Sequence, residues 1–157
     1  MKIPVPILIV DDNAKNLAVI ESVLDSPEYQ LFMVQTAQDA LQALLRMDFA
    51  AVLLDVKMPD MTGYELARLI KGRKLSRHLP IIFISGHHTD KSDVKVGYAA
   101  GGADYVCKPF DPYVVRAKVE VFAELYRQRS ELTTEAANLR AENNRLHQFL
   151  TKQTRNN

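Results

Sequence analysis

Acidic and basic residues that could do phosphate or metal chemistry stand directly after short apolar runs of this chain. Asp11 and Asp12 follow ILIV, Asp55 follows AVLL, Ser85 follows IIFI, and Lys108 follows YVC. A carboxylate at the end of a buried segment loses solvation free energy unless it is paired, binds a metal or takes part in chemistry. If these segments are neighbours, three carboxylates converge and repel one another. Hard oxygen ligands without His or Cys then favour Mg²⁺ as the ion that relieves the repulsion.

A second, simpler interpretation exists for each of these residues taken alone. The DD pair before a helix is typical of an N-cap and a helix-dipole partner, and Asp55 could also be a cap. Ser85 alone reads as a loop residue and Lys108 as a solvated charge. All of these residues stand at strand ends, on one edge of one sheet. This common placement favours a shared metal or phosphate site over separate caps and solvated charges. There, a metal-neutralised Asp55 could attack a phosphoryl donor while Lys108 offsets the charge of the transferred group.

Five strand–helix repeats must position these residues. Alternation of this kind predicts an α/β fold with a parallel sheet and helices on both faces, and the continuous apolar runs agree with strands buried on both sides. Ligands of such sheets sit beyond the carboxyl ends of the strands. The spacing also places Leu45 on one helical face with Ala40, Leu41 and Leu44, and it predicts that Leu69 points inward from its helix. The expected strands are 7–10, 31–34, 51–54, 81–84 and 105–107, and the expected helices are 13–24, 37–47, 63–71 and 90–100.

After Pro112 the character of the chain changes, because neither Gly nor Pro occurs again. Leucines recur every seven residues, which predicts that the fifth helix continues as a coiled-coil arm. We place the α/β domain at 1–125 and the arm at 126–157, with a boundary near Gln128 inside one continuous helix. Asn143 at a core position indicates a parallel dimer in fixed register. A single helix that folds back, or the start of a longer linker, is the alternative. The d positions are Leu125, Leu132, Leu139 and Leu146, and the a positions are Phe122, Arg129, Ala136, Asn143 and Leu150.

Composition excludes several classes of function. The chain has 157 residues and a net charge of +1, so no bulk electrostatic attraction to nucleic acid or to an anionic membrane is expected. One cysteine, Cys107, excludes an intramolecular disulfide framework and fits a reducing, cytoplasmic setting. No apolar run approaches the roughly 18 residues of a membrane span, and the acidic turn after MKIPVPILIV does not fit a signal peptide.

Four stretches together resemble the receiver domain of two-component response regulators. They are ILIVDDN, LLDVKMPDMTGYE, IIFISG and GGADYVCKPF, in the order and spacing of that family over residues 5 to about 125. The resemblance implies a flavodoxin-like, doubly wound sheet of five parallel strands in the order 2-1-3-4-5. It also implies that Asp55 is the phosphoacceptor. Asp11 and Asp12 would bind Mg²⁺ together with Asp55, and Lys57 would offer its backbone carbonyl to the ion.

Further roles follow from the same resemblance. Ser85 matches the switch hydroxyl, Tyr105 the switch aromatic residue, and Lys108 the lysine that contacts the phosphoryl group. Pro109 would follow a cis peptide bond. The sequence departs from the commonest pattern at Gly86, where many relatives have alanine. The pair His87–His88 follows at a variable position, where an imidazole could order water or simply be exposed.

The expected function is that of a two-component receiver rather than an enzyme. A sensor histidine kinase or phosphotransfer protein would donate the phosphoryl group to Asp55, and the state would pass to the arm, a homodimer partner or a downstream protein. The alternative is a receiver that belongs to a larger hybrid kinase, phosphatase or sensor protein. A phosphoaspartyl phosphatase is disfavoured because Lys57 stands where such enzymes carry a second Asp. A nucleotide- or flavin-binding module is disfavoured because DDNAKN replaces a glycine-rich loop.

Overall fold

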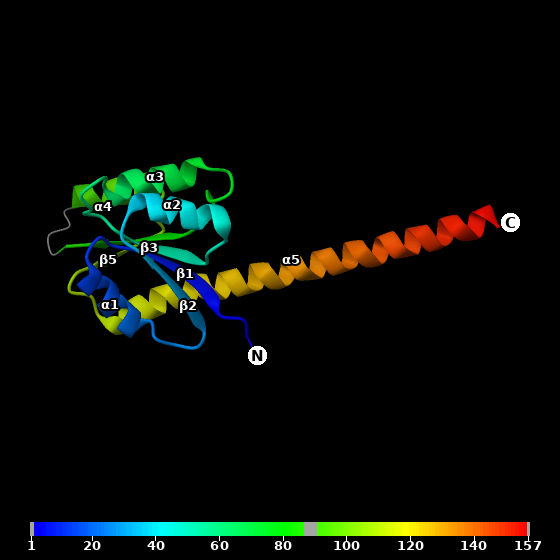
Figure 1. Ribbon diagram of the computed structural model, residues 1–157, viewed down its shortest axis with the longest axis horizontal. Coiled ribbons are helices and arrows are strands. Elements are labelled where there is room, and N and C mark those ends of the chain that lie inside the picture. Colours follow the sequence, from blue (N-terminus) through cyan, green and yellow to red (C-terminus); the bar gives the residue numbers. More distant parts are fainter. Residues whose placement is uncertain (1, 87–90, 157) are drawn as a thin grey trace.

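A five-stranded parallel sheet with helices on both faces forms the N-terminal part of the molecule (Figure 1). The computed structural model describes residues 2–86 and 91–156. The strand order is β2-β1-β3-β4-β5 and every neighbouring pair is parallel, so the predicted flavodoxin-like fold is confirmed. The strands are β1 (Val5–Val10), β2 (Tyr29–Val34), β3 (Ala51–Asp55), β4 (Ile81–Ser85) and β5 (Asp104–Cys107).

Two hydrophobic layers hold the helices on the sheet. Alternate residues of a strand face opposite sides, so Ile7 and Ile9 of β1 enter one layer while Leu8 and Val10 enter the other. The helices α1 and α5 lie on one face, and α2, α3 and α4 lie on the other (Figure 1). The central strands β1, β3 and β4 are buried along their whole length. The helices are α1 (Ala14–Val23), α2 (Ala37–Arg46), α3 (Gly63–Gly72), α4 (Lys91–Ala99) and α5 (Pro112–Arg155).

Side-chain caps start four of the helices just beyond the carboxyl ends of the strands. Asn13 accepts hydrogen bonds from the first turn of α1, Thr36 from α2 and Asp111 from α5. Thr62 forms a reciprocal capping box with Glu65 at the start of α3. These local signals fix where each strand–helix loop ends, so they keep the residues at the strand ends in place.

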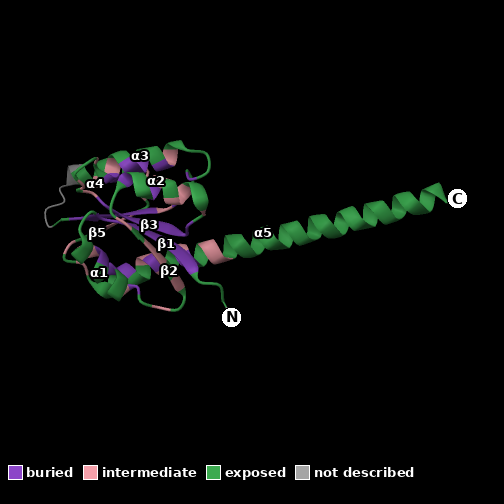
Figure 2. Cartoon of the chain, in the orientation of Figure 1, coloured by how far each residue is buried: buried purple, intermediate pink, exposed green. Residues whose placement is uncertain are grey.

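The helix α5 continues for 44 residues without a break and leaves the sheet behind (Figure 1). Its first part is anchored by Val115, Val119 and Ala123, which are buried in the same layer as α1. From residue 128 to residue 156 every residue is exposed, as the uniform green of the projecting helix shows (Figure 2). Within residues 2–86 and 91–156, no helix combines the length and hydrophobicity needed to cross a lipid bilayer.

Three details of the sequence prediction were wrong. The strand β2 begins at Tyr29, not at residue 31, because Tyr29 pairs with Val5 at the start of β1. Leu45 and Leu69 are 67% and 44% exposed, so neither points inward. Both lie beside the buried face of their helices, which is filled by Ala37 and Ala40 in α2 and by Leu66, Ala67 and Ile70 in α3.

Candidate functional site

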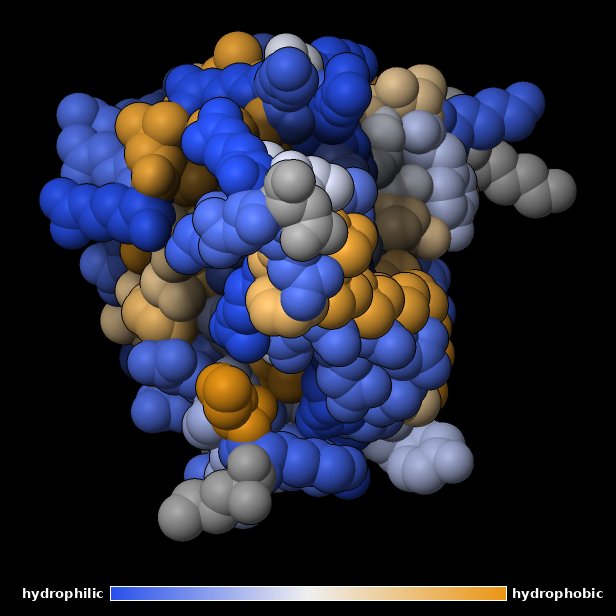
Figure 3. All heavy atoms as spheres, turned by 90° about the vertical axis from the view of Figure 1, so that its right-hand side faces the viewer, coloured by the Kyte–Doolittle hydropathy of each residue, from blue (hydrophilic) through white to orange (hydrophobic). Residues whose placement is uncertain are grey.

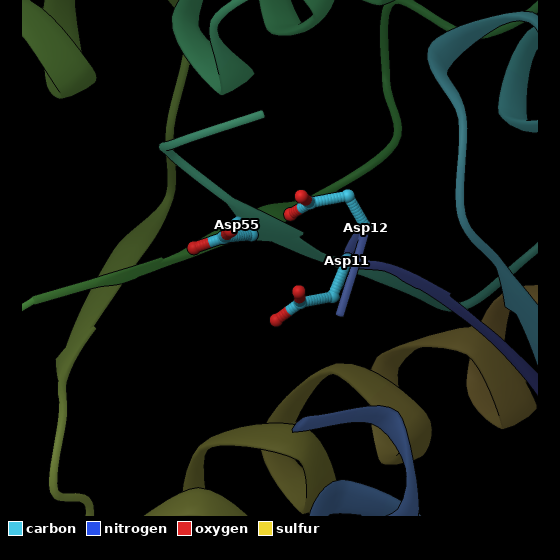
Figure 4. Close-up of side chains that lie close together, drawn as sticks. All are labelled: Asp11, Asp12 and Asp55. Carbon is cyan, nitrogen blue, oxygen red and sulfur yellow. The ribbon is translucent and has the colours of Figure 1, made fainter. Parts of the chain in front are cut away.

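The strand register brings the three predicted carboxylates together at one edge of the sheet. Val10 of β1 pairs with Leu54 of β3, and each is followed directly by an aspartate. Oxygen atoms of Asp11, Asp12 and Asp55 all lie within 4.8 Å of one another. Their side chains extend toward the same space (Figure 4). The convergence predicted from the sequence is therefore a property of the folded chain.

Asp11 is held in place by the start of α1. Its side chain is buried, and its Oδ1 accepts a hydrogen bond from the backbone N–H of Asn13 at 2.9 Å and from the Asn16 amide at 3.3 Å. Asp12, by contrast, is exposed. The two neighbouring carboxylates therefore differ: one is fixed by hydrogen bonds inside the fold, and the other faces solvent.

Lys108 reaches the acidic cluster from the loop after β5. Its Nζ lies 3.2 Å from Oδ1 of Asp55 and 3.5 Å from Oδ2 of Asp11. The peptide bond between Lys108 and Pro109 is cis, as the resemblance implied. The backbone N–H of Lys108 also donates to the carbonyl of Ser85 at 2.7 Å, which links the ends of β4 and β5. One ammonium group thus contacts two of the three carboxylates.

Burial and like charge raise the pKa of Asp55 above its ordinary value. Loss of solvation is the larger cause, Asp11 adds to it, and Lys108 acts in the opposite direction. A carboxylate that is only 5% exposed and borders two others benefits from a cation, and carboxylate oxygens are the ligands that Mg²⁺ prefers. The donor set therefore fits a magnesium ion.

The loop after Asp55 approaches the site so closely that only glycine fits at one position. A Cβ on Gly63 would lie 2.3 Å from the carbonyl oxygen of Asp55, well inside van der Waals contact. The N–H of Gly63 donates to the carbonyl of Val56 at 2.9 Å, which closes the loop. Lys57, the predicted source of a carbonyl ligand, lies in this loop and is exposed.

Tyr105 packs into an aromatic cluster on the α3–α4 side of the sheet. Its ring centroid lies 5.4 Å from that of Phe83, and its hydroxyl contacts the hydroxyl of Tyr64. A Cβ on Gly97 of α4 would lie 2.4 Å from the Tyr105 ring. Ser85, the last residue of β4, is buried. The predicted pair His87–His88 lies outside the described residues.

Sequence reasoning missed the residues that support this site. The role of Asn13 could have been anticipated, because Asn directly before a helical pattern is a typical N-cap. The roles of Tyr64 and Gly97 could not, because each depends on a contact with Tyr105 of another element, β5. Asn16 contacts Asp11 only five residues away, but no capping pattern signals that contact.

Comparison with known proteins identifies the family. The model of the response regulator receiver domain matches residues 7–120, and the chain belongs to that family. Over 114 residues it is 32% identical to the transcriptional regulatory protein GltR of Pseudomonas aeruginosa, covering 73% of this chain and 47% of GltR. It is also 32% identical over 126 residues to a probable cyclic di-GMP phosphodiesterase of Vibrio cholerae, covering 80% of this chain and 28% of that protein.

A solved structure supports the same assignment. The receiver domain of the sensor histidine kinase PA1611 of Pseudomonas aeruginosa, crystallised with magnesium in its active-site cleft, is 29% identical with a TM-score of 0.70. The match covers 78% of this chain and 99% of that domain. The chain therefore spans a whole receiver domain but less than half the length of the two curated relatives named above. Receiver domains of this family accept a phosphoryl group on an aspartate and switch conformation.

Proposed function

We propose that this receiver accepts its phosphoryl group on Asp55. The observation that carries the proposal is the position of Asp55 at the buried end of β3, beside Asp11 and Asp12 and 3.2 Å from the ammonium group of Lys108. A carboxylate oxygen of Asp55 attacks the phosphorus, the bond from phosphorus to the donor breaks, and an acyl phosphate forms. Lys108 is then in reach of the new phosphoryl oxygens. A sensor histidine kinase or a phosphotransfer protein is the proposed donor.

Asp11, Asp12 and Asp55, with the backbone carbonyl of Lys57, are the proposed magnesium ligands. When bound, the ion offsets the negative charge of the carboxylates and of the phosphoryl oxygens. The chain itself contributes the positioning: Asn13 and Asn16 hold Asp11 through its Oδ1. The exposed Asp12 leaves one side of the cluster open to solvent and to a donor.

Ser85 and Tyr105 are the proposed switch residues. Phosphorylation adds nearly two negative charges and three acceptor oxygens to Asp55. A hydrogen bond from Ser85 to one of those oxygens would move the carboxyl end of β4 toward Asp55. Tyr105, packed between Phe83 and Tyr64, is placed to carry that change to α4. Phosphorylation would thus shift the population between two packings of this face.

Labelling with a small phosphodonor tests the acceptor. The wild-type chain should become labelled in the presence of Mg²⁺, and the Asp55→Asn variant should not. Asp60→Asn is the matched control, because Asp60 is an exposed aspartate five residues further along the same loop. Persistent labelling of the Asp55→Asn variant would contradict the assignment.

The arm, residues 126–157, is proposed to pair with the arm of a second copy in a parallel coiled coil. Leu125, Leu132, Leu139 and Leu146 are each more than half exposed, although their spacing places them on one stripe. A stripe of this kind is stable when a second helix covers it. Solution mass tests the pairing: a monomer at tens of micromolar would count against it.

The receiver is proposed to regulate a protein rather than to catalyse a reaction on a substrate. Its output would be read by the paired arm, by a downstream protein, or by further domains if the chain is part of a larger kinase, phosphatase or sensor protein. The length of the two curated relatives supports the last possibility. We propose a cytoplasmic site of action, without direct contact to nucleic acid or membrane, because the net charge is only +1.

A further inference from the structure

An arginine stands where the proposed coiled coil needs an apolar residue. Arg129 occupies an a position, one turn after Leu125 and just before Leu132. In a paired coiled coil, a positions are enclosed by four residues of the facing helix. Two cations facing each other there would be desolvated and would repel, which weakens pairing at the point where the arms leave the receiver domains.

The receiver domain itself binds this cation. Nη2 of Arg129 contacts Oδ2 of Asp48 at 2.5 Å, although the two residues are 81 positions apart. The guanidinium also lies over the ring of Tyr126, 5.6 Å from its centroid. The second oxygen of Asp48 lies 3.5 Å from Nε2 of His78. The charge of Arg129 is therefore paired on the domain side of the helix.

We propose that Asp48 holds Arg129 out of the coiled-coil seam and so allows the arm of a second copy to pair directly from the edge of the receiver domain. This inference rests on the proposed pairing of the arms. In it, Asp48 of the receiver domain controls the position along α5 at which the two arms begin to pair. Asp48 contributes no surface to the seam itself. It acts by positioning the side chain of Arg129.

The surface next to Arg129 supports a second copy as the partner. Hydrophobic residues form a band along one side of the projecting helix (Figure 3). A cavity of about 160 Å³ lies between the first seam residues and the receiver domain. Further along, Glu135 and Arg140 fall at g and e positions, where opposite charges of two parallel arms meet. The cavity is lined by Ala50, His78, Pro80, Phe122, Leu125, Tyr126 and Arg129.

A neighbouring arginine, Arg127, binds the helix to the receiver domain on the other flank. Arg127 is only 14% exposed, and its Nη1 lies 2.9 Å from Glu120 and 3.3 Å from Glu124. Its Nη2 lies 3.8 Å from Glu28, which precedes β2. Arg127 and Arg129 thus bind the segments before β2 and before β3. With the helix held on both flanks, releasing Arg129 alone should change the seam without detaching α5.

A double-mutant cycle on the dimer dissociation constant tests the proposal. The four proteins are the full chain, Asp48→Ala, Arg129→Leu and the double variant, each studied by sedimentation over a range of concentrations. Asp48→Ala should raise the dissociation constant by up to about tenfold, because neither Arg129 of the pair of arms is then held away from the seam. Arg129→Leu should lower it. In the Arg129→Leu background, Asp48→Ala should have less than about a twofold effect, since no cation remains to be held.

Asp25→Ala is the matched control, because it removes the same charge from an exposed loop of the receiver domain. It should leave the dissociation constant unchanged. If Asp48→Ala leaves the wild-type dimer unchanged, or weakens the Arg129→Leu dimer equally, the role of Asp48 is overturned while pairing stands. If the wild-type chain is monomeric at every concentration, both the pairing and this inference fail. Unfolding curves of Asp48→Ala that match wild type exclude misfolding as the cause of a weaker dimer.

Discussion

The receiver domain and the arm use leucine in opposite ways. Leu54 of β3 is completely buried between two layers of its own chain, whereas Leu139 of the arm is 59% exposed. Both lie in regular secondary structure, Leu54 in a strand and Leu139 in a helix. The difference is that the sheet has helices on both faces, while the arm extends beyond every other element (Figure 2). The domain therefore completes its core within its own chain, whereas no other element of the described residues covers the apolar stripe of the arm.

Truncating one leucine in each region tests this comparison most directly. Leu54→Ala should lower the free energy of unfolding of the receiver domain by about 2–5 kcal/mol, because it leaves a cavity in a packed core. Leu139→Ala should change that free energy by less than about 0.5 kcal/mol at concentrations where the arms are unpaired. Urea unfolding followed by circular dichroism measures both. A large loss of domain stability in Leu139→Ala would show that the arm folds back onto the domain.

Two glycines at opposite ends of α3 provide a second contrast, within the receiver domain. Gly63→Ala should destabilise it by about 1–3 kcal/mol, because the new Cβ would lie 2.3 Å from the carbonyl oxygen of Asp55. Gly72→Ala should instead stabilise it by about 0.5–1 kcal/mol, because a Cβ there meets nothing within 4 Å and the helix gains a better former. Thermal unfolding of the two variants, one at each end of α3, measures the contrast. Equal effects would show that the loop after Asp55 is not tightly packed.

Magnesium should stabilise the receiver domain and leave the arm unaffected. At a concentration ten times its dissociation constant, the ion should raise the free energy of unfolding by about 1.4 kcal/mol. In Asp55→Asn this gain should shrink, because one ligand is lost. The same gain in wild type and variant would argue against Asp55 as a ligand.

Asp55→Asn should also change how stability depends on pH in the absence of magnesium. The pKa of Asp55 is raised in the fold, so its contribution to stability is complete below the unfolded value of 3.8 and is lost as the pH rises through the folded value. At pH 7 the ionised carboxylate therefore costs stability, and the variant should be more stable than wild type. Denaturant titrations at several pH values measure this difference.

Glu120→Gln should have a small effect and tests the segment of α5 that joins the receiver domain to the arm. The hydrogen bond from the Tyr29 hydroxyl lowers the pKa of Glu120 below its usual 4.5, and Arg127 acts in the same direction. The ionised form thus stabilises the fold above pH 4.5, and the contribution is lost as the pH falls through the lowered value. Because the side chain is 46% exposed, the variant should lose only about 0.5–1 kcal/mol at pH 7. A loss that persists at low pH would point to packing instead.

Local patterns were sufficient to predict the order of the elements and the convergence of the acidic site. Strands in a parallel sheet end at the same edge, so Asp11, Asp12, Asp55 and Lys108 could be brought together from their positions after apolar runs alone. The strand order and the cis peptide bond came from the family resemblance. The arm was predicted from its seven-residue spacing, which depends only on the geometry of one helix.

Tertiary structure decided what these patterns left open. The start of β2 follows from its pairing with Val5, and the outward positions of Leu45 and Leu69 follow from which helix faces meet the sheet. The ion pair between Asp48 and Arg129 joins residues 81 positions apart. No local sequence pattern predicts a contact between residues so far apart in the chain. Local sequence patterns thus indicated which residues could do chemistry and approximately where the helices begin. Only the folded chain decided which side chains meet, because contacts between distant segments depend on packing of the whole domain.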